Sequence, residues 1–228
     1  DKGTWNYGIE QLLNWQAVNK KRKLVILSGT IDQEISLCEI SSIDKNIALN
    51  ISRLLRSGGL DNYRKFLNCL NYLVVDEKLI PDDFLNITFY ADPYLHDWKN
   101  ESGEKIGIIS YKSLFLANEI EVNEKLNLQL RKCGLSPKTF FISTLKDHII
   151  QKKLIEIFKK EDIKLIITTT SFSSSQIKNN ELIENSTNIF TSLKIPILQL
   201  LSSNRSRKKW LNSSIGMNSS DLLMQIII

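Results

Sequence analysis

The sequence has few of the residues on which most catalytic and cofactor-binding motifs depend. It holds nine glycines, three cysteines and two histidines in 228 residues. Ser28-Gly29-Thr30 follows an apolar run, but no Gly-Lys-Ser/Thr comes after it, which excludes a P-loop, and a dinucleotide fingerprint is absent from the chain. HExxH, CxxC and GxSxG motifs are also absent. No set of nucleophile, base and orienting residue can be assembled, so we predict no catalytic residue and no cofactor bound by this chain.

The cysteines are too widely spaced to suggest a disulfide framework or a zinc site. Cys38, Cys69 and Cys133 each lie within an apolar helical pattern, which is typical of buried free thiols in a reducing compartment. The chain has neither an apolar run of membrane-spanning length nor a signal-peptide pattern. We therefore expect a cytoplasmic protein with no membrane span.

The charge pattern argues against a nucleic-acid partner. The net charge is +5, but the lysines and arginines are scattered among nearly as many acidic residues. A nucleic-acid-binding surface would need its cations clustered on one face. The one dense run, residues 204–210 (NRSRKKW), is interpreted as an exposed helix start in preference to an anion site.

The second half of the chain shows alternating strand and helix patterns. Two β-rich apolar runs, Ile106–Ile109 and Thr139–Ile142, flank a helical pattern that ends at Cys133-Gly134. Their short connections predict a parallel, right-handed crossover. A further helix and two further strands are expected at Ile149–Phe158, Leu165–Ile167 and Ile195–Leu200. The alternation predicts an α/β fold with a Rossmann-like or flavodoxin-like parallel sheet and flanking helices.

The first half is predicted to be smaller and mainly helical. Apolar periodicity indicates helices over Trp5–Val18 and Ile43–Leu55, and another after Gly58-Gly59 with Asp61 as its N-cap. Leu24–Leu27 reads as a short strand. Residues 76–103 lose this periodicity and hold two of the four prolines. We therefore predict a helical α/β portion over 1–103, with an irregular linker at 76–103, and a Rossmann-like domain over 104–228.

The two ends suggest an excised piece of a longer polypeptide. The chain begins at Asp1 without a methionine and stops inside the apolar run Leu222–Ile228. An exposed run of this kind invites pairing or aggregation. The second domain is accordingly expected to be truncated at its C-terminal end.

Polar residues follow each predicted strand of the second domain. They are Ser110–Ser113, Ser143–Asp147 and the hydroxyl-rich stretch Thr168–Ser175. The carboxyl ends of parallel strands meet at one edge, where open α/β sheets bind ligands. The stretch Thr168–Ser175 is explained equally well as a flexible loop. Asp147 is expected to cap the next helix.

His96, in the linker, is the one candidate metal ligand. It stands in the segment Tyr94-Leu95-His96-Asp97-Trp98, which could hold a metal or a planar ligand. One histidine and one aspartate are too few to build a metal site. We therefore favour a loop packed by its aromatic residues and predict no metal site.

Five segments of the chain carry a recognisable set of motifs: LLRSGGLDNYRKFLNCL (54–70), IGIISYKS (106–113), FISTLKD (141–147), IITTTSFS (166–173) and the stretch 196–223, which begins PILQLLSS. Taken in this order, they resemble the large subunit of ATP-dependent cobaltochelatase (CobN) and, more loosely, that of magnesium chelatase. They match the family's patterns GGxEN, VGI.FYRS, V.SSLKD, NATAFS and PVLQ…SGS.R..W in that order. Leu60 departs from this pattern by replacing a proline, and Phe115–Glu119 lacks the family's small polar and acidic residues.

The resemblance implies a fragment of a subunit that binds a tetrapyrrole and the metal to be inserted. For a cobaltochelatase these are hydrogenobyrinic acid a,c-diamide and Co²⁺, in cobalamin biosynthesis. ATP would be bound by separate AAA+ ATPase subunits, and the isolated fragment would be inactive. The alternative within the family is magnesium chelatase, which inserts Mg²⁺ into protoporphyrin IX. Outside the family, the alternative is a non-enzymatic two-lobed ligand-binding module.

A large macrocycle that carries carboxylates and amides needs an apolar cavity with a few polar contacts. Family-matched or strand-end residues could supply these contacts. They are Tyr111, Lys112, Lys146, Ser171, Ser173, Ser202 and Arg205.

Overall fold

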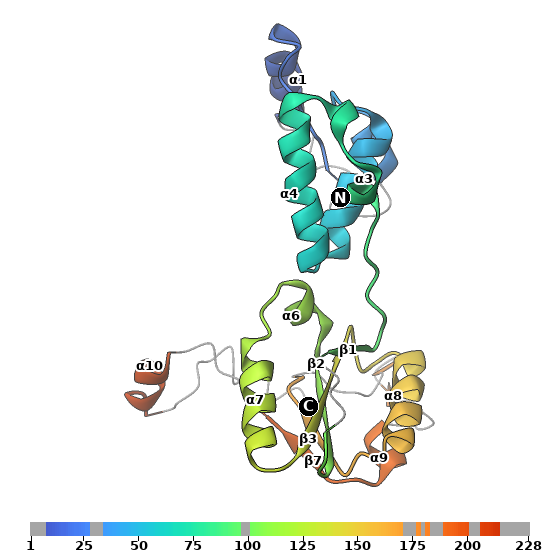
Figure 1. Ribbon diagram of the computed structural model, residues 1–228, viewed down its shortest axis with the longest axis vertical. Coiled ribbons are helices and arrows are strands. Elements are labelled where there is room, and N and C mark those ends of the chain that lie inside the picture. Colours follow the sequence, from blue (N-terminus) through green and yellow to red (C-terminus); the bar gives the residue numbers. More distant parts are fainter. Residues whose placement is uncertain are drawn as a thin grey trace. The chain divides into compact units, whose positions relative to one another are not determined.

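The structure is a computed structural model that describes residues 8–27, 34–96, 101–170, 177–178, 181–182, 189–200 and 206–214. The chain forms two compact units, one ending at Phe89 and the other starting at Tyr90 (Figure 1). The boundary predicted at residue 103 falls inside the second unit, because strand β1 (Tyr94–His96) pairs with that unit's sheet. None of the helices in the described ranges is long and apolar enough to cross a membrane.

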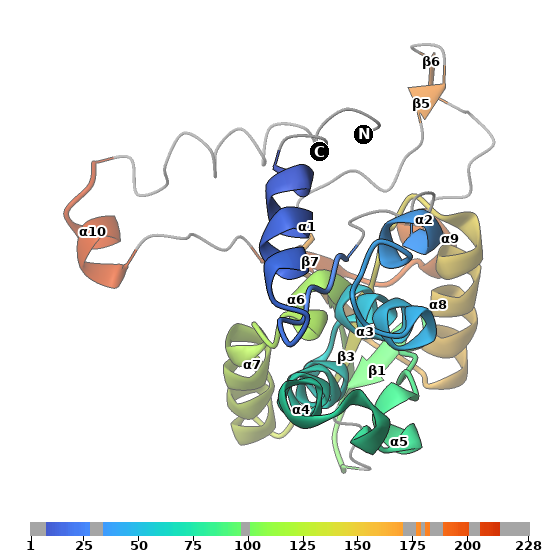
Figure 2. The same cartoon turned by 90° about the horizontal axis from the view of Figure 1, so that it is seen from above.

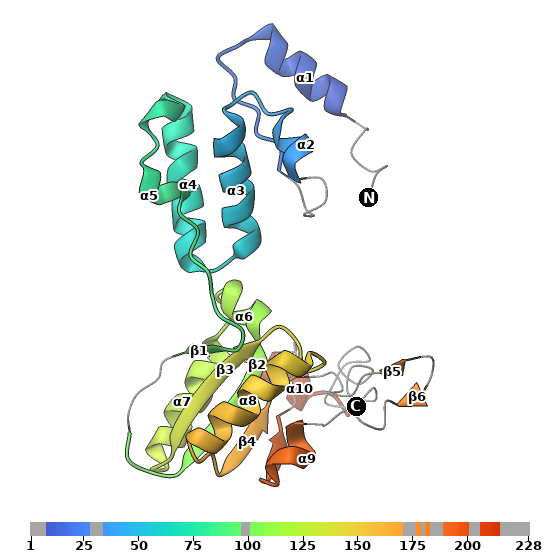
Figure 3. The same ribbon diagram turned by 90° about the vertical axis from the view of Figure 1, so that its right-hand side faces the viewer.

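The first unit is built from helices in its described residues. They are α1 (Ile9–Val18), α2 (Glu34–Cys38), α3 (Lys45–Ser57), α4 (Leu60–Val75), the 3-10 helix η1 (Glu77–Leu79) and α5 (Asp82–Leu85). Helices α3 and α4 lie side by side (Figure 3). Ile51 and Leu54 of α3 pack with Cys69 and Leu73 of α4 in a buried core. The two short helices η1 and α5 occupy part of the predicted irregular linker.

The predicted N-cap at Asp61 is wrong by two residues. Gly58 and Gly59 have φ values of 64° and 85°, and α4 already begins at Leu60 with Gly59 as its N-cap. Two consecutive glycines let the chain reverse between α3 and α4 without further residues. Asp61 therefore lies in the first turn of α4, where its negative charge interacts favourably with the positive end of the helix dipole. Its Oδ1 lies 3.9 Å from Arg64 Nη1.

The predicted strand at Leu24–Leu27 is also wrong. This segment is not assigned to a strand and joins no sheet of the described residues. The Leu24 amide donates to Ser42 Oγ at 2.7 Å, and the Ile26 amide donates to Ser41 Oγ at 2.9 Å. Serine hydroxyls thus satisfy the backbone groups that a neighbouring strand would otherwise bind.

The second unit contains the predicted parallel sheet. In the described part of the chain its five strands run in the order β1-β3-β2-β4-β7. The strands after β1 are β2 (Lys105–Tyr111), β3 (Ser136–Ile142), β4 (Leu165–Thr168) and β7 (Ile197–Gln199). These four are parallel, and β1 is antiparallel to β3. A separate antiparallel pair joins β5 (Ile177–Lys178) to β6 (Glu181–Leu182). The order of the parallel strands is that of a flavodoxin-like sheet, which confirms the predicted fold class.

Helices cover both faces of this sheet. The helices in the described part of the second unit are α6 (Lys112–Leu116), α7 (Glu121–Lys132), α8 (His148–Lys160), α9 (Ile189–Leu193) and α10 (Arg207–Leu211). Helix α7 lies against one face, and α8 and α9 lie against the other, in both Figure 1 and Figure 2. Leu126 and Leu130 of α7 pack on Ile106 and Ile108, whereas Leu154 of α8 belongs to the cluster on the opposite face. This three-layer arrangement explains why the strands read as continuous apolar runs.

The N-cap of α8 and the burial of two of the three cysteines agree with the sequence-based predictions. Asp147 caps α8 as predicted, accepting a hydrogen bond from the Ile149 amide at 2.7 Å. Cys38 and Cys69 are buried and form no disulfide, and burial raises the pKa of the Cys69 thiol. Cys133 is free but exposed, contrary to prediction, because it is the C-cap residue beyond the last turn of α7.

Candidate functional site

The strand order places a topological switch point between β2 and β4. The chain leaves β2 through α7 to reach β3 on one side, and leaves β3 through α8 to reach β4 on the other. In open α/β sheets the connections diverge at such a point and leave a crevice at the carboxyl ends of the two strands. Here the residues at those ends are Ser110 and Tyr111 of β2, and Thr168 of β4 with the two threonines that follow it.

Four hydroxyl residues at the switch point, here called the hydroxyl cluster, form two hydrogen-bonded pairs: Ser110 with Thr169, and Thr168 with Thr170. Thr169 Oγ1 donates to Ser110 Oγ at 2.9 Å, and the hydroxyl oxygens of Thr168 and Thr170 lie 2.8 Å apart. Ser110, Thr168 and Thr170 are buried, and Gln199 Nε2 of β7 donates to the Thr170 carbonyl at 3.4 Å. For residues 168–170 the structure therefore favours a packed strand end over a flexible loop.

The segment 90–93 lies against the carboxyl ends of β2 and β3. The Asp92 carboxylate accepts hydrogen bonds from the Ser143 amide, at 3.2 and 3.3 Å, and from the Ser143 hydroxyl. The Tyr90 carbonyl accepts a hydrogen bond from Lys112 Nζ at 2.7 Å, and the Asp92 carbonyl accepts one from Lys153 Nζ at 3.3 Å. A ligand that binds the ammonium group of Lys112 must therefore compete with the Tyr90 carbonyl for that group.

The predicted contact residues that the structure describes come to the same edge. Tyr111 is the half-buried last residue of β2, in register with Ile142 of β3, and Lys112 opens α6 directly after it. Lys146 is exposed in the loop between β3 and α8, which leaves the sheet at the same edge. The other four predicted residues, Ser171, Ser173, Ser202 and Arg205, lie outside the described residues. Their part in binding stays a prediction.

His96 lies in β1 among aromatic side chains. Its ring centroid is 5.5 Å from that of Phe115 and 5.9 Å from that of Phe141. Tyr94 packs on Phe115 with centroids 4.3 Å apart, and Tyr90 joins the same group at 5.0 Å from Phe115. Within the described ranges, no group of three or more His, Cys, Asp or Glu residues is placed to hold a metal ion. Residues 94–96 are thus packed among aromatic side chains, as a strand and not as the predicted loop, whereas Asp97 and Trp98 lie outside the described residues.

Sequence reasoning missed the part played by Asp92. Its partner Ser143 is 51 residues away, and a lone Asp-Pro pair signals only a turn. The polar stretch 143–147 is recognisable in the sequence, but neither this stretch nor the segment around Asp92 indicates by itself that Asp92 faces Ser143.

Comparison with known proteins identifies the chain's relatives. A model of the family described as CobN/Magnesium Chelatase matches residues 52–228. The chain belongs to this family. The chain is 24% identical over 237 residues to the aerobic cobaltochelatase subunit CobN of Pseudomonas aeruginosa, with 99% of this chain and 18% of that protein covered. It is 28% identical over 207 residues to an uncharacterized protein of Methanocaldococcus jannaschii, with 80% of this chain and 17% of that protein covered.

A solved structure of a cobaltochelatase subunit shares the fold. The catalytic subunit of cobaltochelatase from Mycobacterium tuberculosis matches with a TM-score of 0.75 and 19% identity, over 97% of this chain and 18% of that one. This likeness supports the α/β architecture of the CobN-family chain. In length, the chain spans less than a fifth of each of the two cobaltochelatase subunits that it matches. The resemblance predicted from residues 54–223 is confirmed.

Proposed function

We propose that this CobN-family chain is part of the large subunit of an ATP-dependent cobaltochelatase. The subunit would insert Co²⁺ into hydrogenobyrinic acid a,c-diamide in the cytoplasm, as a step of cobalamin biosynthesis. The observation that carries the proposal is the family match over residues 52–228, together with similarity to CobN over nearly the whole chain. Co²⁺ is a substrate here. ATP hydrolysis is assigned to AAA+ partner subunits, in keeping with the absence of a P-loop from this sequence.

Within that subunit, the carboxyl edge of the sheet would contact the polar rim of the macrocycle. The exposed ammonium group of Lys146 and the side chains of Tyr111 and Lys112 lie at this edge. The proposed contacts also include Ser171, Ser173, Ser202 and Arg205. Cationic and hydroxyl groups suit a ligand that carries carboxylates and amides, because charge-assisted hydrogen bonds to carboxylates are strong.

Reconstitution tests the assignment. The full-length subunit, with its companion ATPase subunits, Co²⁺ and ATP, is expected to convert hydrogenobyrinic acid a,c-diamide to the cobalt product, followed by absorbance. The 228-residue chain alone is expected to give no product. If the reconstituted complex inserts Mg²⁺ into protoporphyrin IX and does not insert Co²⁺, the subunit belongs to a magnesium chelatase and the cobaltochelatase proposal is wrong. Turnover by the isolated chain would contradict the assignment of catalysis to the whole subunit.

Substitutions in the full-length subunit test the contacts. Lys146→Ala and Arg205→Ala are each expected to weaken macrocycle binding about tenfold, because each removes one charge-assisted hydrogen bond. Lys112→Ala is expected to weaken binding and also to lower the thermal midpoint, since it releases the Tyr90 carbonyl. Lys152→Ala, an exposed lysine on α8, is the control. Fluorescence titration gives the dissociation constants, and values equal to the control would remove the substituted residue from the site.

A further inference from the structure

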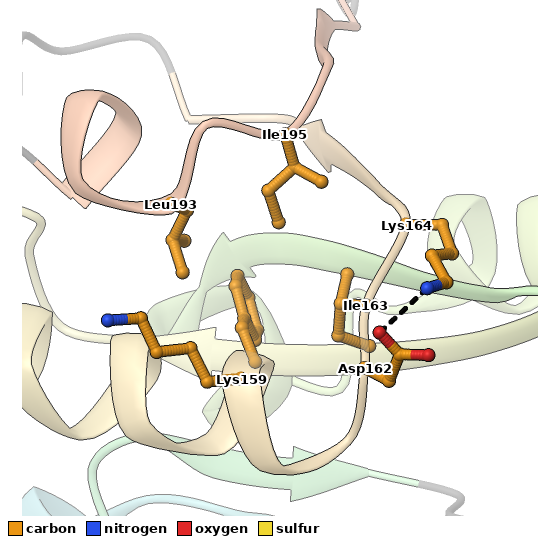
Figure 4. A pocket seen from close by; sticks show the side chains of 7 residues that line it. Lys159, Asp162, Ile163, Lys164, Leu193 and Ile195 are labelled. Carbon is orange, nitrogen blue, oxygen red and sulfur yellow. Dashed lines mark hydrogen bonds and ion pairs between the residues drawn. The ribbon is translucent and has the colours of Figure 1, made fainter.

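A second site lies at the opposite end of the parallel strands from the hydroxyl cluster. A pocket of about 320 Å³ opens between the last turn of α8, the turn into β4 and the turn between α9 and β7 (Figure 4). This volume is near the lower end of the roughly 300–1,000 Å³ typical of small-molecule sites. The residues that line it are not among the proposed macrocycle contacts, so the pocket is separate from the edge discussed above.

Four of the seven residues that line the pocket are apolar. Phe158 and Ile163 are buried members of the cluster between the sheet and α8, and Leu193 and Ile195 are partly buried against the same cluster. Figure 4 shows Leu193 and Ile195 facing Ile163 across the opening. These side chains suit an aliphatic or aromatic group, and the remaining lining residues, Lys159, Asp162 and Lys164, are polar.

The rim of the pocket carries an uncompensated positive charge. Lys164 Nζ lies 2.7 Å from Asp162 Oδ1, so these two charges offset one another. Glu161, the residue before Asp162, pairs with Lys105: its Oε2 lies 2.9 Å from Lys105 Nζ. Lys159 lies on the other side of the opening from the Asp162–Lys164 pair. It has no ion-pair or hydrogen-bonding partner in the part of the chain that the structure describes. Charge complementarity at this rim therefore favours an anion.

The two turns that shape the rim have an unusual backbone conformation. Asp162 has a φ of 56° and Lys194 has a φ of 52°, and neither is a glycine. Left-handed conformations outside glycine cost free energy and persist where the surrounding structure holds them. Lys194 is exposed and lies in the chain between Leu193 and Ile195, which both line the pocket.

We propose that this pocket binds a small amphipathic carboxylate, with its apolar part between Ile163, Leu193 and Ile195 and its carboxylate group on Lys159. The site goes beyond the chelatase proposal and does not depend on it. The competing explanation is that Lys159 only offsets the negative end of the α8 dipole. Lys160, the next residue of the same helix turn, offsets that dipole equally well but does not line the pocket. It therefore provides a matched control.

The test uses octanoate and its uncharged counterpart octanol as probes of the 228-residue chain. Each is titrated to about 3 mM, below the solubility limit of octanol in water, which reaches dissociation constants in the low millimolar range. Methyl NMR signals of Ile163, Leu193 and Ile195 report binding. We expect octanoate to shift all three signals and to bind more tightly than octanol. If none of the three signals shifts with octanoate, the proposal is overturned.

Two variants and one control separate the contribution of the charge from that of the apolar side chains. Lys159→Met is expected to weaken octanoate binding about fivefold, the effect of one partly exposed ion pair, and to leave octanol binding unchanged. Lys160→Met should leave both unchanged. Ile195→Trp, which fills the pocket, should abolish the binding of both probes. Equal octanoate affinity in Lys159→Met and Lys160→Met would overturn the carboxylate site and leave a purely apolar groove.

Discussion

Gly103→Ala is expected to destabilise the second unit by about 3 kcal/mol or more. Gly103 has a φ of 118°, and a methyl group added there would overlap the carbonyl oxygen of Gly134. The obstacle is backbone, which cannot rotate away as a flexible side chain can. A backbone shift that relieves this overlap would also displace the start of β3, because the Ser136 amide donates to the Glu104 carbonyl at 2.9 Å directly beside this contact.

Gly134→Ala is the matched control for this prediction. Gly134 also has a positive φ, of 76°, but a methyl group there meets nothing within 4 Å. The substitution should cost only about 1 kcal/mol, the usual cost of a left-handed non-glycine residue. Urea unfolding gives the two free energies, and hydrogen exchange at the Ser136 amide locates the damage. Equal destabilisation by both substitutions would show that the overlap at Gly103 is relieved elsewhere.

Asn62→Ala is expected to destabilise the first unit by about 3 kcal/mol. Asn62 is fully buried in α4, within the GGLDN segment of the family pattern. Its Nδ2 donates to the Gly58 carbonyl at 2.7 Å and to the Thr88 carbonyl at 2.8 Å, and its Oδ1 accepts from the Thr88 amide at 2.8 Å. Alanine would leave three backbone groups without their partner, and burial makes each loss costly.

Two comparison variants make the Asn62 prediction specific. Asn71→Ala changes an exposed asparagine of the same helix and should alter the free energy of unfolding by less than about 0.5 kcal/mol. Asn62→Asp keeps the oxygen that accepts from the Thr88 amide but loses both donors, so it should also destabilise the unit. Hydrogen exchange at the Thr88 amide should accelerate most in Asn62→Ala, which removes the acceptor, and less in Asn62→Asp, which keeps it. If Asn62→Asp unfolds like the wild type, the two donor bonds contribute little.

Much of the second unit was readable because its signals are local. The runs at Ile106–Ile109, Thr139–Ile142 and Leu165–Ile167 are apolar at successive positions, as expected for strands covered by helices on both faces. The cap at Asp147 needs only the residues that follow it. Leu24–Leu27 gave the same kind of signal and was misread, because serine side chains and not a strand satisfy its backbone.

The candidate site was readable only in outline. Placing Tyr111, Lys112 and Lys146 at one edge requires no more than parallel strands, because all parallel strands end at the same edge. The contacts within that edge were not predicted. Thr169 lies against Ser110 across 59 residues of chain, and Asp92 reaches Ser143 across 51. The pocket beside Lys159 likewise depends on two turns that are distant in sequence.

The sequence by itself determined the parallel α/β architecture of the second unit, several helix ends and the membership of the CobN/magnesium chelatase family. Each of these depends on apolar periodicity, short-range capping or ordered motifs, which are set by residues close together in the chain. Only the tertiary structure decided the strand order, the switch point between β2 and β4, and the pairing of Asn62 with Thr88 and of Asp92 with Ser143. Those features depend on contacts between distant segments, for which many pairings satisfy the same local pattern until the packed core selects one.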